Sequence, residues 1–269
     1  MSEIRLAALY RYPVKSLAGQ ELEHSLVDGF GLAEDRRWML VDRENRYVTQ
    51  RELPEMALIS VSLDQRRLIL NAPGMEPLFV ETPAESAESI SVQIWGDRCL
   101  ARLCSNESQI WLSHYLGHSL RLVYMAEEEQ RQVDRSYAQE GDRTAFSDGF
   151  PLLLISQASL DDLNGRLAQA LPMIRFRPNL VVTGCEPYAE DGWSLIRIGA
   201  MTLRVVKPCS RCKITTVDPY TAETGSEPLR TLASYRRRGN QVFFGQNLIH
   251  NGPGELAVGM PVEVLRHAE

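Results

Sequence analysis

The sequence contains few cysteines and no long hydrophobic run. Its five cysteines among 269 residues are odd in number and widely spaced, which disfavours the disulfide framework of a small secreted protein. No hydrophobic run approaches the roughly 20 residues that a membrane-spanning helix needs, and residues 1–6 lack a charged and then apolar leader. We therefore expect a cytoplasmic protein that has no membrane partner.

Lysine is also scarce, because only three of the 29 basic residues are lysines. Lys207 and Lys213 flank a pair of cysteines, and Lys15 lies in the segment Tyr12–Ser16. A compact ammonium group is a good partner for a phosphate or a thiolate. The net charge of −6 disfavours a nucleic-acid partner, but it leaves room for local cationic sites that bind small anions.

The cysteine pair Cys209 and Cys212 encloses two residues, one of which is Arg211. Neighbouring cations favour a thiolate, which is a nucleophile or a metal ligand. A zinc ribbon would need a second pair of ligands, which the other cysteines do not form. A thioredoxin-type redox pair expects a helix at the second thiol, whereas β-branched residues follow it here. A buried, inert pair is the remaining alternative.

Short alternating segments separated by turn residues predict a mainly β protein with a few helices. In the first half we expect a helix over residues 106–117 and strands over 4–10, 22–27, 37–41, 57–63, 67–70, 89–95, 99–103 and 120–124. In the second half we expect a helix from an N-cap at Ser159 to Leu171, and strands over 151–156, 179–183, 194–198, 201–206, 243–248 and 261–265. The polar segment 125–142, which we interpret as a surface connection, divides the chain into domains 1–125 and 126–269.

Seven short segments follow one another in an order that spans almost the whole chain. They are Tyr12-Pro-Val-Lys-Ser16, Asp35-Arg-Arg-Trp38, Phe146-Ser-Asp148, Phe176-Arg-Pro-Asn179, Cys185 with Tyr188-Ala-Glu-Asp-Gly-Trp193, Cys209-Ser-Arg-Cys-Lys-Ile-Thr-Thr-Val-Asp-Pro219 and Phe244-Gly-Gln246. Each is a weak signal alone, but the ordered set resembles the MOSC family in its two-part form. That group includes the mitochondrial amidoxime-reducing components and the bacterial YcbX proteins. The resemblance implies an N-terminal MOSC β-barrel domain followed by a MOSC β-barrel domain.

The resemblance also implies a molybdenum cofactor, in which a pterin dithiolene holds the metal and carries a terminal phosphate. In the family's pattern the second thiol of the pair is a molybdenum ligand, and this role falls on Cys212. A soft thiolate suits such a metal. Cys209 then has a supporting role in the packing around the ligand.

Five residues match the family positions that hold the pterin and its phosphate: Lys15, Ser16, Arg36, Arg177 and Asn179. Lysine offers a point charge, and arginine offers a fork of donors for phosphate oxygens. Asp148 matches an acidic residue near the metal that orients substrate or relays protons. Gly149 and Phe150 follow it where the mitochondrial proteins have small hydroxyl residues, so backbone amides would have to replace those contacts.

The resemblance implies that the protein reduces N-hydroxylated compounds, converting a hydroxylamine-type substrate to the amine and water. Because Lys15 and Arg36 lie in one domain and Cys212 in the other, we expect the site where the domains meet. Cys99 and Cys104 lack the further cysteines of a ferredoxin cluster. The expected electron donor is therefore a ferredoxin domain missing from this sequence, or a separate ferredoxin-type protein with its reductase.

Two alternatives to a reductase stay open. In one, the pair Cys209 and Cys212 bears a persulfide and the protein is a sulfur carrier. In the other, the protein binds or delivers the molybdenum cofactor without catalysis. The four tryptophans, Trp95 among them, are expected to serve packing, and the histidines are not expected to form a metal site.

Overall fold

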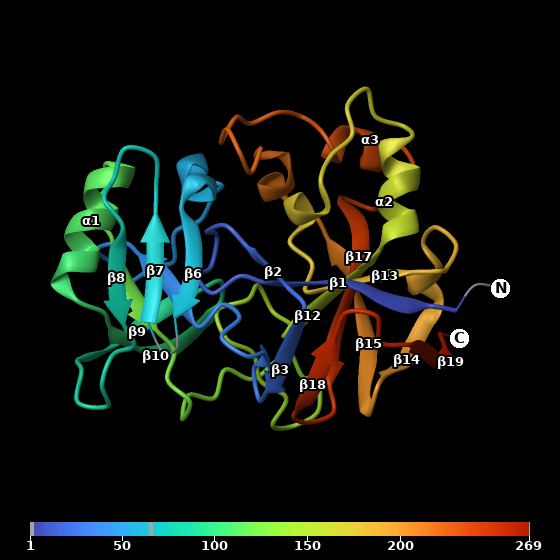
Figure 1. The fold of residues 1–269 in the computed structure, drawn as a ribbon, viewed down its shortest axis with the longest axis horizontal. Helices are drawn as coiled ribbons and strands as arrows, with labels where there is room; N and C mark the ends of the chain where they lie inside the picture. The colour runs from blue at the N-terminus through green and yellow to red at the C-terminus, as the bar shows by residue number, and fades with distance from the viewer. Residues whose placement is uncertain (1–2, 65–66, 269) are drawn as a thin grey trace.

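The computed structural model describes residues 3–64 and 67–268. Figure 1 shows two halves side by side, one containing α1 and the other α2 and α3. Strands form most of the regular structure, so the prediction of a mainly β protein with a few helices is confirmed. No helix in the described ranges is long and apolar enough to cross a membrane.

The regular elements follow one another along the chain, and a long connection over residues 125–151 joins β11 to β12. The elements up to residue 124 are β1 (Arg5–Arg11), β2 (Gln20–Leu22), β3 (His24–Asp28), β4 (Gly31–Leu32), β5 (Trp38–Val41), β6 (Ser60–Asp64), β7 (Arg67–Asn71), β8 (Leu78–Glu81), β9 (Ser89–Ile94), β10 (Asp97–Leu103), α1 (Asn106–Leu116) and β11 (Arg121–Tyr124). The later ones are β12 (Leu152–Ser156), α2 (Gln157–Asn164), β13 (Leu180–Thr183), β14 (Trp193–Ile198), β15 (Met201–Ser210), α3 (Leu229–Ala233), β16 (Arg237–Arg238), β17 (Gln241–His250), β18 (Gly254–Ala257) and β19 (Val262–His267).

The largest sheet takes strands from both ends of the chain. Its order is β19-β14-β15-β17-β12-β13-β1-β2, with β16 paired to β17. β1 pairs with β13, and β3 pairs with β18, because Leu6, Leu9 and Val27 are buried in the core of this half. β1, β2 and β3 therefore belong to sheets of the C-terminal half, although the division drawn from the sequence assigned them to domain 1–125. Val14 and Leu17, between β1 and β2, are buried in the core of the other half.

Both faces of the large sheet are covered, which explains the continuous apolar run of β12. Leu152 and Leu154 lie in a core cluster on one face of the sheet. Leu153 and Ile155 lie in a second cluster with Leu160 of α2. Strands buried on both faces lack the alternation of apolar and polar residues.

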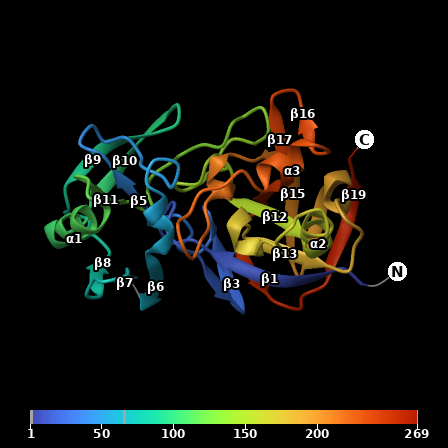
Figure 2. The ribbon, with the colours of Figure 1, turned by 90° about the horizontal axis from the view of Figure 1, so that it is seen from above.

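The other half is built from two small sheets and α1. β5-β11-β10-β9 form one sheet and β6-β7-β8 form the other, while α1 packs beside β11 and β8 (Figure 2). The side chain of Ser105 caps the start of α1, and Gly117 ends it with a φ of +68°. Its buried residues are Ser108, Leu112 and Leu116. The helix predicted over 106–117 is confirmed.

α2 begins earlier than predicted, and the prediction of Ser159 as N-cap was wrong. Its N-cap is Ser156, and it ends at Asn164 rather than near Leu171. The Ser159 hydroxyl instead donates to Oε1 of Glu190 at 2.8 Å, and the same oxygen accepts the backbone N–H of Ser156 at 3.0 Å. A buried carboxylate thus satisfies donors at the helix N-terminus, and Ser159 is free to lie inside the helix.

β15 extends beyond the expected end at Val206 as far as Ser210. Its pairing with β17 is irregular between Val205 and Lys207 and again between Pro208 and Ser210. Cys212 then precedes a short 3₁₀ helix, Lys213–Thr216. Cys209 therefore lies on the strand, whereas Cys212 lies just beyond its end.

The segment 125–142 is more than the surface connection predicted from its polarity. Arg131 is buried and donates to the carbonyl oxygens of Ala145 and Ser147 at 2.8 and 2.7 Å. Asp142 accepts two hydrogen bonds from Arg204 of β15, at 2.7 and 2.8 Å. Internal ion pairing of this kind compensates for the lack of apolar residues and fixes the segment against both halves.

Gly245 in β17 is a position where the backbone requires glycine. Its φ is +82°, and a Cβ atom there would lie 2.8 Å from the carbonyl oxygen of Leu154 and 2.6 Å from Cγ1 of Ile155. We expect Gly245→Ala to lower the free energy of unfolding by about 2–4 kcal/mol, because it adds a clash to a left-handed backbone. The control is Gly239→Ala, with a φ of +59° and open space around the new Cβ, for which we expect about 1 kcal/mol. Urea unfolding measures both losses, and equal losses would contradict the prediction.

Candidate functional site

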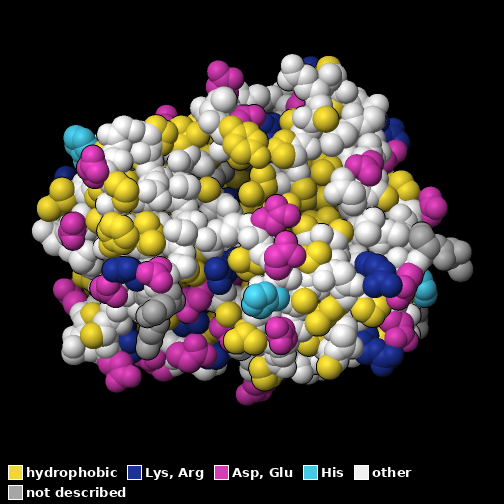
Figure 3. Space-filling view, in the orientation of Figure 1, with side chains coloured by type: hydrophobic (Ala, Val, Ile, Leu, Met, Phe, Trp, Pro, Cys, Tyr) yellow, Lys and Arg dark blue, Asp and Glu magenta, His cyan; other side chains and the backbone are white. Residues whose placement is uncertain are grey.

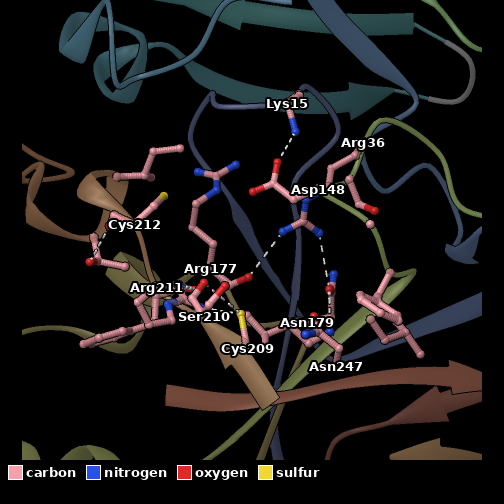
Figure 4. A pocket seen from close by; sticks show the side chains of 18 of the residues that line it. Lys15, Arg36, Asp148, Arg177, Asn179, Cys209, Ser210, Arg211, Cys212 and Asn247 are labelled. Atoms are coloured by element: carbon pink, nitrogen blue, oxygen red, sulfur yellow. Dashed lines mark hydrogen bonds and ion pairs between the residues drawn. The ribbon is translucent and has the colours of Figure 1, made fainter. Parts of the chain in front are cut away.

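One pocket between the two halves collects every candidate site residue from the sequence. It is lined by Lys15, Ser16, Arg36, Ser147, Asp148, Gly149, Phe150, Leu152, Leu153, Phe176, Arg177, Asn179, Cys209, Ser210, Arg211, Cys212, Ile214, Thr215 and Asn247. In Figure 4, Lys15 faces Asp148 in the upper part of the view, and Cys209 and Cys212 lie below and to the left.

Strand pairing brings two of the sequence segments together. β1 and β13 are antiparallel, with Leu9 opposite Leu180. The end of β1 therefore lies beside the start of β13. As a result, the segment 12–16 meets the segment 177–179, although more than half of the chain separates them.

Three pocket residues have a left-handed backbone. The φ angles of Ser16, Arg36 and Arg177 are +66°, +51° and +56°. Residues other than glycine adopt this region rarely, at a cost of roughly 1–3 kcal/mol each. Hydrogen bonds hold the backbone in place, since Gln50 Nε2 donates to the Ser16 carbonyl oxygen at 2.6 Å and Arg36 N donates to that of Tyr12 at 2.8 Å. Backbone strain that the surroundings maintain is typical of functional sites.

The ring of Tyr12 lies against two guanidinium groups of the pocket. The central carbons of Arg36 and Arg177 lie 4.7 and 4.2 Å from the ring centroid. Arg36 also forms an ion pair with Asp35 and donates to Oδ1 of Asn179 at 3.3 Å. Desolvation opposes its charged form, but the attraction of Asp35 outweighs this and raises the pKa of Arg36.

Arg177 has less compensation for its charge. Its Nη1 donates to the carbonyl oxygen of Leu17 at 2.7 Å, whereas Nη2 is buried without a hydrogen-bond partner among the described residues. Desolvation, followed by the repulsion of Arg36, lowers the pKa of Arg177 to about 10. Nε of Arg211 is likewise buried and unpaired in the described part of the chain. Buried N–H groups without acceptors beside like charges indicate a pocket that suits an anion.

Lys15 and Asp148 form an ion pair on the pocket wall. Lys15 Nζ donates to Asp148 Oδ1 at 2.5 Å and to the carbonyl oxygen of Phe146 at 2.9 Å. Desolvation lowers the pKa of Lys15 to about 8, against the attraction of Asp148. Desolvation by the pocket walls also disfavours the Asp148 carboxylate, but Lys15 and Arg51 overcome it and hold the pKa of Asp148 well below its usual range. Asp148 is therefore ionised at neutral pH, while the charge of Lys15 depends on pH.

Asn179 lines the pocket and also forms hydrogen bonds that hold the pocket together. Its Nδ2 donates to the carbonyl oxygen of Tyr10 at 3.1 Å, and its Oδ1 accepts the backbone N–H of Leu153 at 3.2 Å. The same Oδ1 accepts from Arg36. Asn179 thus ties the large sheet to Arg36 and positions that guanidinium.

The two cysteines have different surroundings. Sγ of Cys212 accepts a hydrogen bond from Arg51 Nη2 at 3.4 Å, whereas Sγ of Cys209 accepts from Arg211 Nη1 at 3.0 Å. Cys209 also packs against the core cluster that includes Phe176. The environment of Cys209 is that of a packing residue, and Cys212 faces residues of the other half.

The lysines beside the cysteine pair do not reach the thiols as the sequence interpretation expected. Nζ of Lys207 lies 4.3 Å from the ring centroid of Tyr137, and Lys213 is not among the residues that line the pocket. The neighbouring cations are instead Arg51 and Arg211. No group of three His, Cys, Asp or Glu side chains that could hold a metal occurs within residues 3–64 and 67–268, so a metal bound at Cys212 would need ligands from a cofactor.

Sequence reasoning missed two residues of the site, Arg51 and Trp95. The central carbon of Arg51 lies 4.6 Å from the Trp95 ring centroid, and Trp95 Nε1 donates to Asp148 Oδ1 at 3.2 Å. Trp95 is 43% exposed, so the prediction that all tryptophans serve packing was wrong for this one. The sequence does contain a signal for Trp95. Together with Gly96 it forms the two-residue loop between the paired residues Ile94 and Asp97, and such loops usually contain Asn-Gly, so a tryptophan there is unusual.

A second and more hydrophobic pocket adjoins the first. Its lining residues are Ala18, Gly19, Gln50, Ala57, Leu58, Ser60, Pro73, Ile174, Arg175, Arg177, Ile214, Val217, Pro219 and Tyr220. Figure 3 shows a hollow bordered mainly by hydrophobic side chains at the junction of the two halves. The cationic pocket and the hydrophobic pocket share Arg177 and Ile214.

Comparison with known proteins identifies the family. Residues 3–119 match the model of the MOSC N-terminal beta barrel domain, and residues 141–263 match that of the MOSC domain. The chain therefore belongs to the MOSC family, in the form that combines these two domains, and the resemblance noted in the sequence is confirmed.

Curated relatives cover most of the chain. This chain is 35% identical to mitochondrial amidoxime-reducing component 1 of Mus musculus over 279 aligned residues. The alignment covers 97% of this chain and 82% of the relative. The identity to the component 1 protein of Homo sapiens is 35% over 280 residues, with the same coverage of 97% and 82%. Mitochondrial amidoxime reducing component 2 of Homo sapiens is 35% identical over 241 residues, which is 86% of this chain and 72% of the relative.

The charge of Lys15 makes anion binding sensitive to pH. We expect sulfate, which keeps its charge over this range, to raise the melting temperature of the protein purified without cofactor. The effect should weaken as the pH rises through about 8, because Lys15 then loses its proton and the pocket loses one positive charge. Thermal melts with and without sulfate on either side of that pH measure it. Lys15→Met should show a smaller effect without this pH dependence, and an undiminished effect in the unmodified protein at high pH would contradict the prediction.

Proposed function

We propose that this protein is a molybdenum-cofactor-dependent reductase of N-hydroxylated compounds. The observation that carries the proposal is the pocket in which buried arginine N–H groups without acceptors occur together with the Cys212 thiol. An anion-binding wall and a soft sulfur ligand in one pocket suit a phosphate-bearing cofactor with a bound metal. The reaction class comes from the curated relatives, whose names describe amidoxime-reducing components.

The residues of the pocket fit the parts of such a cofactor. Lys15, Arg36 and Arg177 would meet the phosphate and the pterin, Ser16 and Asn179 would add polar contacts, and Cys212 would be the protein ligand of the metal. When bound, the cofactor supplies the two electrons with which a hydroxylamine-type substrate and two protons become an amine and water. The pocket's own contribution is to hold the cofactor at the junction and to orient the groups around the thiol.

Asp148 fits an orienting role better than a proton-donating one. Its low pKa keeps it ionised at neutral pH, so it has no proton to give. Its carboxylate instead accepts hydrogen bonds from Lys15 and Trp95, and Arg51 lies 3.7 Å from its second oxygen. We therefore propose that Asp148 fixes these three side chains at the mouth of the pocket and that protons come from solvent.

The proposal includes a cytoplasmic location and a separate electron donor of the ferredoxin type with its reductase. The sequence offers no second set of cysteines with the spacing of a ferredoxin cluster. We propose that electrons arrive at the pocket from a ferredoxin-type group outside residues 1–269, carried by a partner. Asp148 and Trp95 lie on its exposed side, where a partner could approach.

Cys212→Ser should reduce activity to below about 1% of the unmodified protein, because oxygen is a poor substitute for a soft thiolate ligand. Its melting temperature should change little, since the Cys212 side chain is only partly buried and belongs to none of the core clusters. Cys209→Ser is the matched control and should retain most of the activity. Reductase assays and thermal melts on both variants check this, and full activity in Cys212→Ser would remove Cys212 from the metal site.

Production in cells that make the cofactor tests the function itself. We expect close to one molybdenum per chain by elemental analysis, and reduction of a hydroxylamine-type substrate with a chemical one-electron donor. A ferredoxin and its reductase should also support turnover, whereas NADH alone should not. Bound molybdenum without turnover would instead favour a cofactor-binding or delivery protein. A persulfide on the cysteine pair without molybdenum would favour a sulfur carrier.

A further inference from the structure

We propose that Arg51 is a positioning residue that holds the sulfur of Cys212 and the carboxylate of Asp148 in a fixed relation across the junction of the two halves. The inference rests on the proposed function, because these two groups need a defined geometry only if a reaction takes place beside them. Arg51 belongs to none of the seven sequence segments that resemble the MOSC family.

The contacts of Arg51 reach both groups. Its Nη2 lies 3.4 Å from Sγ of Cys212 and 3.7 Å from Oδ2 of Asp148. The Arg51 side chain is only 18% exposed, whereas the Asp148 carboxylate that it approaches is 58% exposed and also reaches solvent. Cys212 follows β15 of the large sheet, whereas Arg51 comes from the α1-containing half. One guanidinium therefore couples the thiol to the carboxylate and one half of the protein to the other.

The backbone that carries Arg51 is anchored at the pocket. The N–H of Arg51 donates to Oγ1 of Thr49 at 3.2 Å, and that hydroxyl donates to Oε2 of Glu52 at 2.6 Å. The neighbouring Gln50 donates to the carbonyl oxygen of Ser16 at 2.6 Å. Thr49 and Gln50 are both buried. The turn is thus fixed to the same segment that supplies Lys15, and the position of the guanidinium is determined by the pocket.

Trp95 fixes the guanidinium from its other side. The indole ring lies under Arg51, and its N–H donates to the same carboxylate that Arg51 approaches. Trp95 has a φ of +54°, a conformation that is strained for a bulky side chain. A two-residue hairpin loop requires a positive φ at its first position, so the β9–β10 hairpin fixes this conformation and holds the indole beside Arg51. A planar guanidinium suits both the stacking and the two acceptors, which an ammonium group does not.

Cofactor-loaded variants test the role by separating steps of turnover. Arg51→Gln should lower kcat by about 10- to 100-fold, with KM changed by less than about threefold, because displacement of reacting groups impairs the reaction more than substrate binding. Molybdenum content should be unchanged, and the electron paramagnetic resonance signal of the partly reduced metal should be altered or heterogeneous. Arg51→Lys should recover only part of kcat, since it keeps the charge but loses the planar group that stacks on Trp95.

The matched control is Arg67→Gln. Arg67 also pairs with an aspartate, Asp64, at 2.8 Å and lies 5.2 Å from the ring centroid of Phe79, but its partners lie in β6 and β8 and include neither Cys212 nor Asp148. It should leave kcat and the resonance signal unchanged. A kcat in Arg51→Gln equal to that of the control would overturn the inference. The inference would also be overturned if activity fell only in proportion to the molybdenum content. In that case Arg51 would help to bind the cofactor rather than position the thiol.

A second measurement uses protein without cofactor and does not depend on the proposed function. If Arg51 contacts Cys212 in solution, the melting temperature of Arg51→Gln/Cys212→Ser should differ by about 2 °C or more from the sum of the two single changes. The corresponding pair with Arg67→Gln should be additive. Additivity for Arg51 would overturn the inference. A different outcome separates this inference from the proposed function. If the unmodified protein binds molybdenum but is inactive, and the melting temperatures of the Arg51 and Cys212 variants are not additive, the proposed function is refuted while the contact is established.

Discussion

Buried positive charge between the two halves is the constraint on which the rest of the structure depends. Lys15, Arg36 and Arg177 surround one pocket, and the carboxylates of Asp35 and Asp148 offset part of their charge. Desolvation lowers the pKa of both Lys15 and Arg177, so the folded protein holds these groups at an electrostatic cost that a bound anion would relieve. Much of the surrounding architecture keeps the cations together in spite of this, including the left-handed backbone at three pocket residues and the ring of Tyr12 between the guanidinium groups.

The site is composite because neither half provides all of its chemistry. The C-terminal half supplies the thiols and Arg177, the first strand of the chain leads into Lys15, and the α1-containing half contributes Arg51 and Trp95. Positive charge that binds an anion and a soft thiol that binds a metal are different chemical requirements. The junction allows each to be met by a separate rigid element, with Arg51 and Asp148 linking the two.

Local patterns predicted the elements that depend on local interactions. α1, which was predicted over 106–117, begins after its cap Ser105 and ends at Gly117, and both residues adjoin the helix in the chain. The start of α2 was predicted less well: its N-cap is Ser156 rather than Ser159, whose hydroxyl bonds instead to Glu190, a residue distant in the sequence. In the site, ordered motifs identified residues that one pocket brings together. They could not identify Arg51, whose approach to Cys212 depends on how the halves meet.

The pairing of β1 with β13 has a consequence for synthesis on the ribosome. β1 is translated before its partner β13, which becomes available only after a further stretch of more than half of residues 1–269, and Arg5 also bridges to Pro261. Until then β1 has an unpaired edge and exposes Leu6 and Leu9, which are buried in the finished core. The α1-containing half can form its small sheets earlier, since its strands pair with near neighbours. The cationic pocket is therefore completed late, because its lining also needs residues as far along the chain as Asn247.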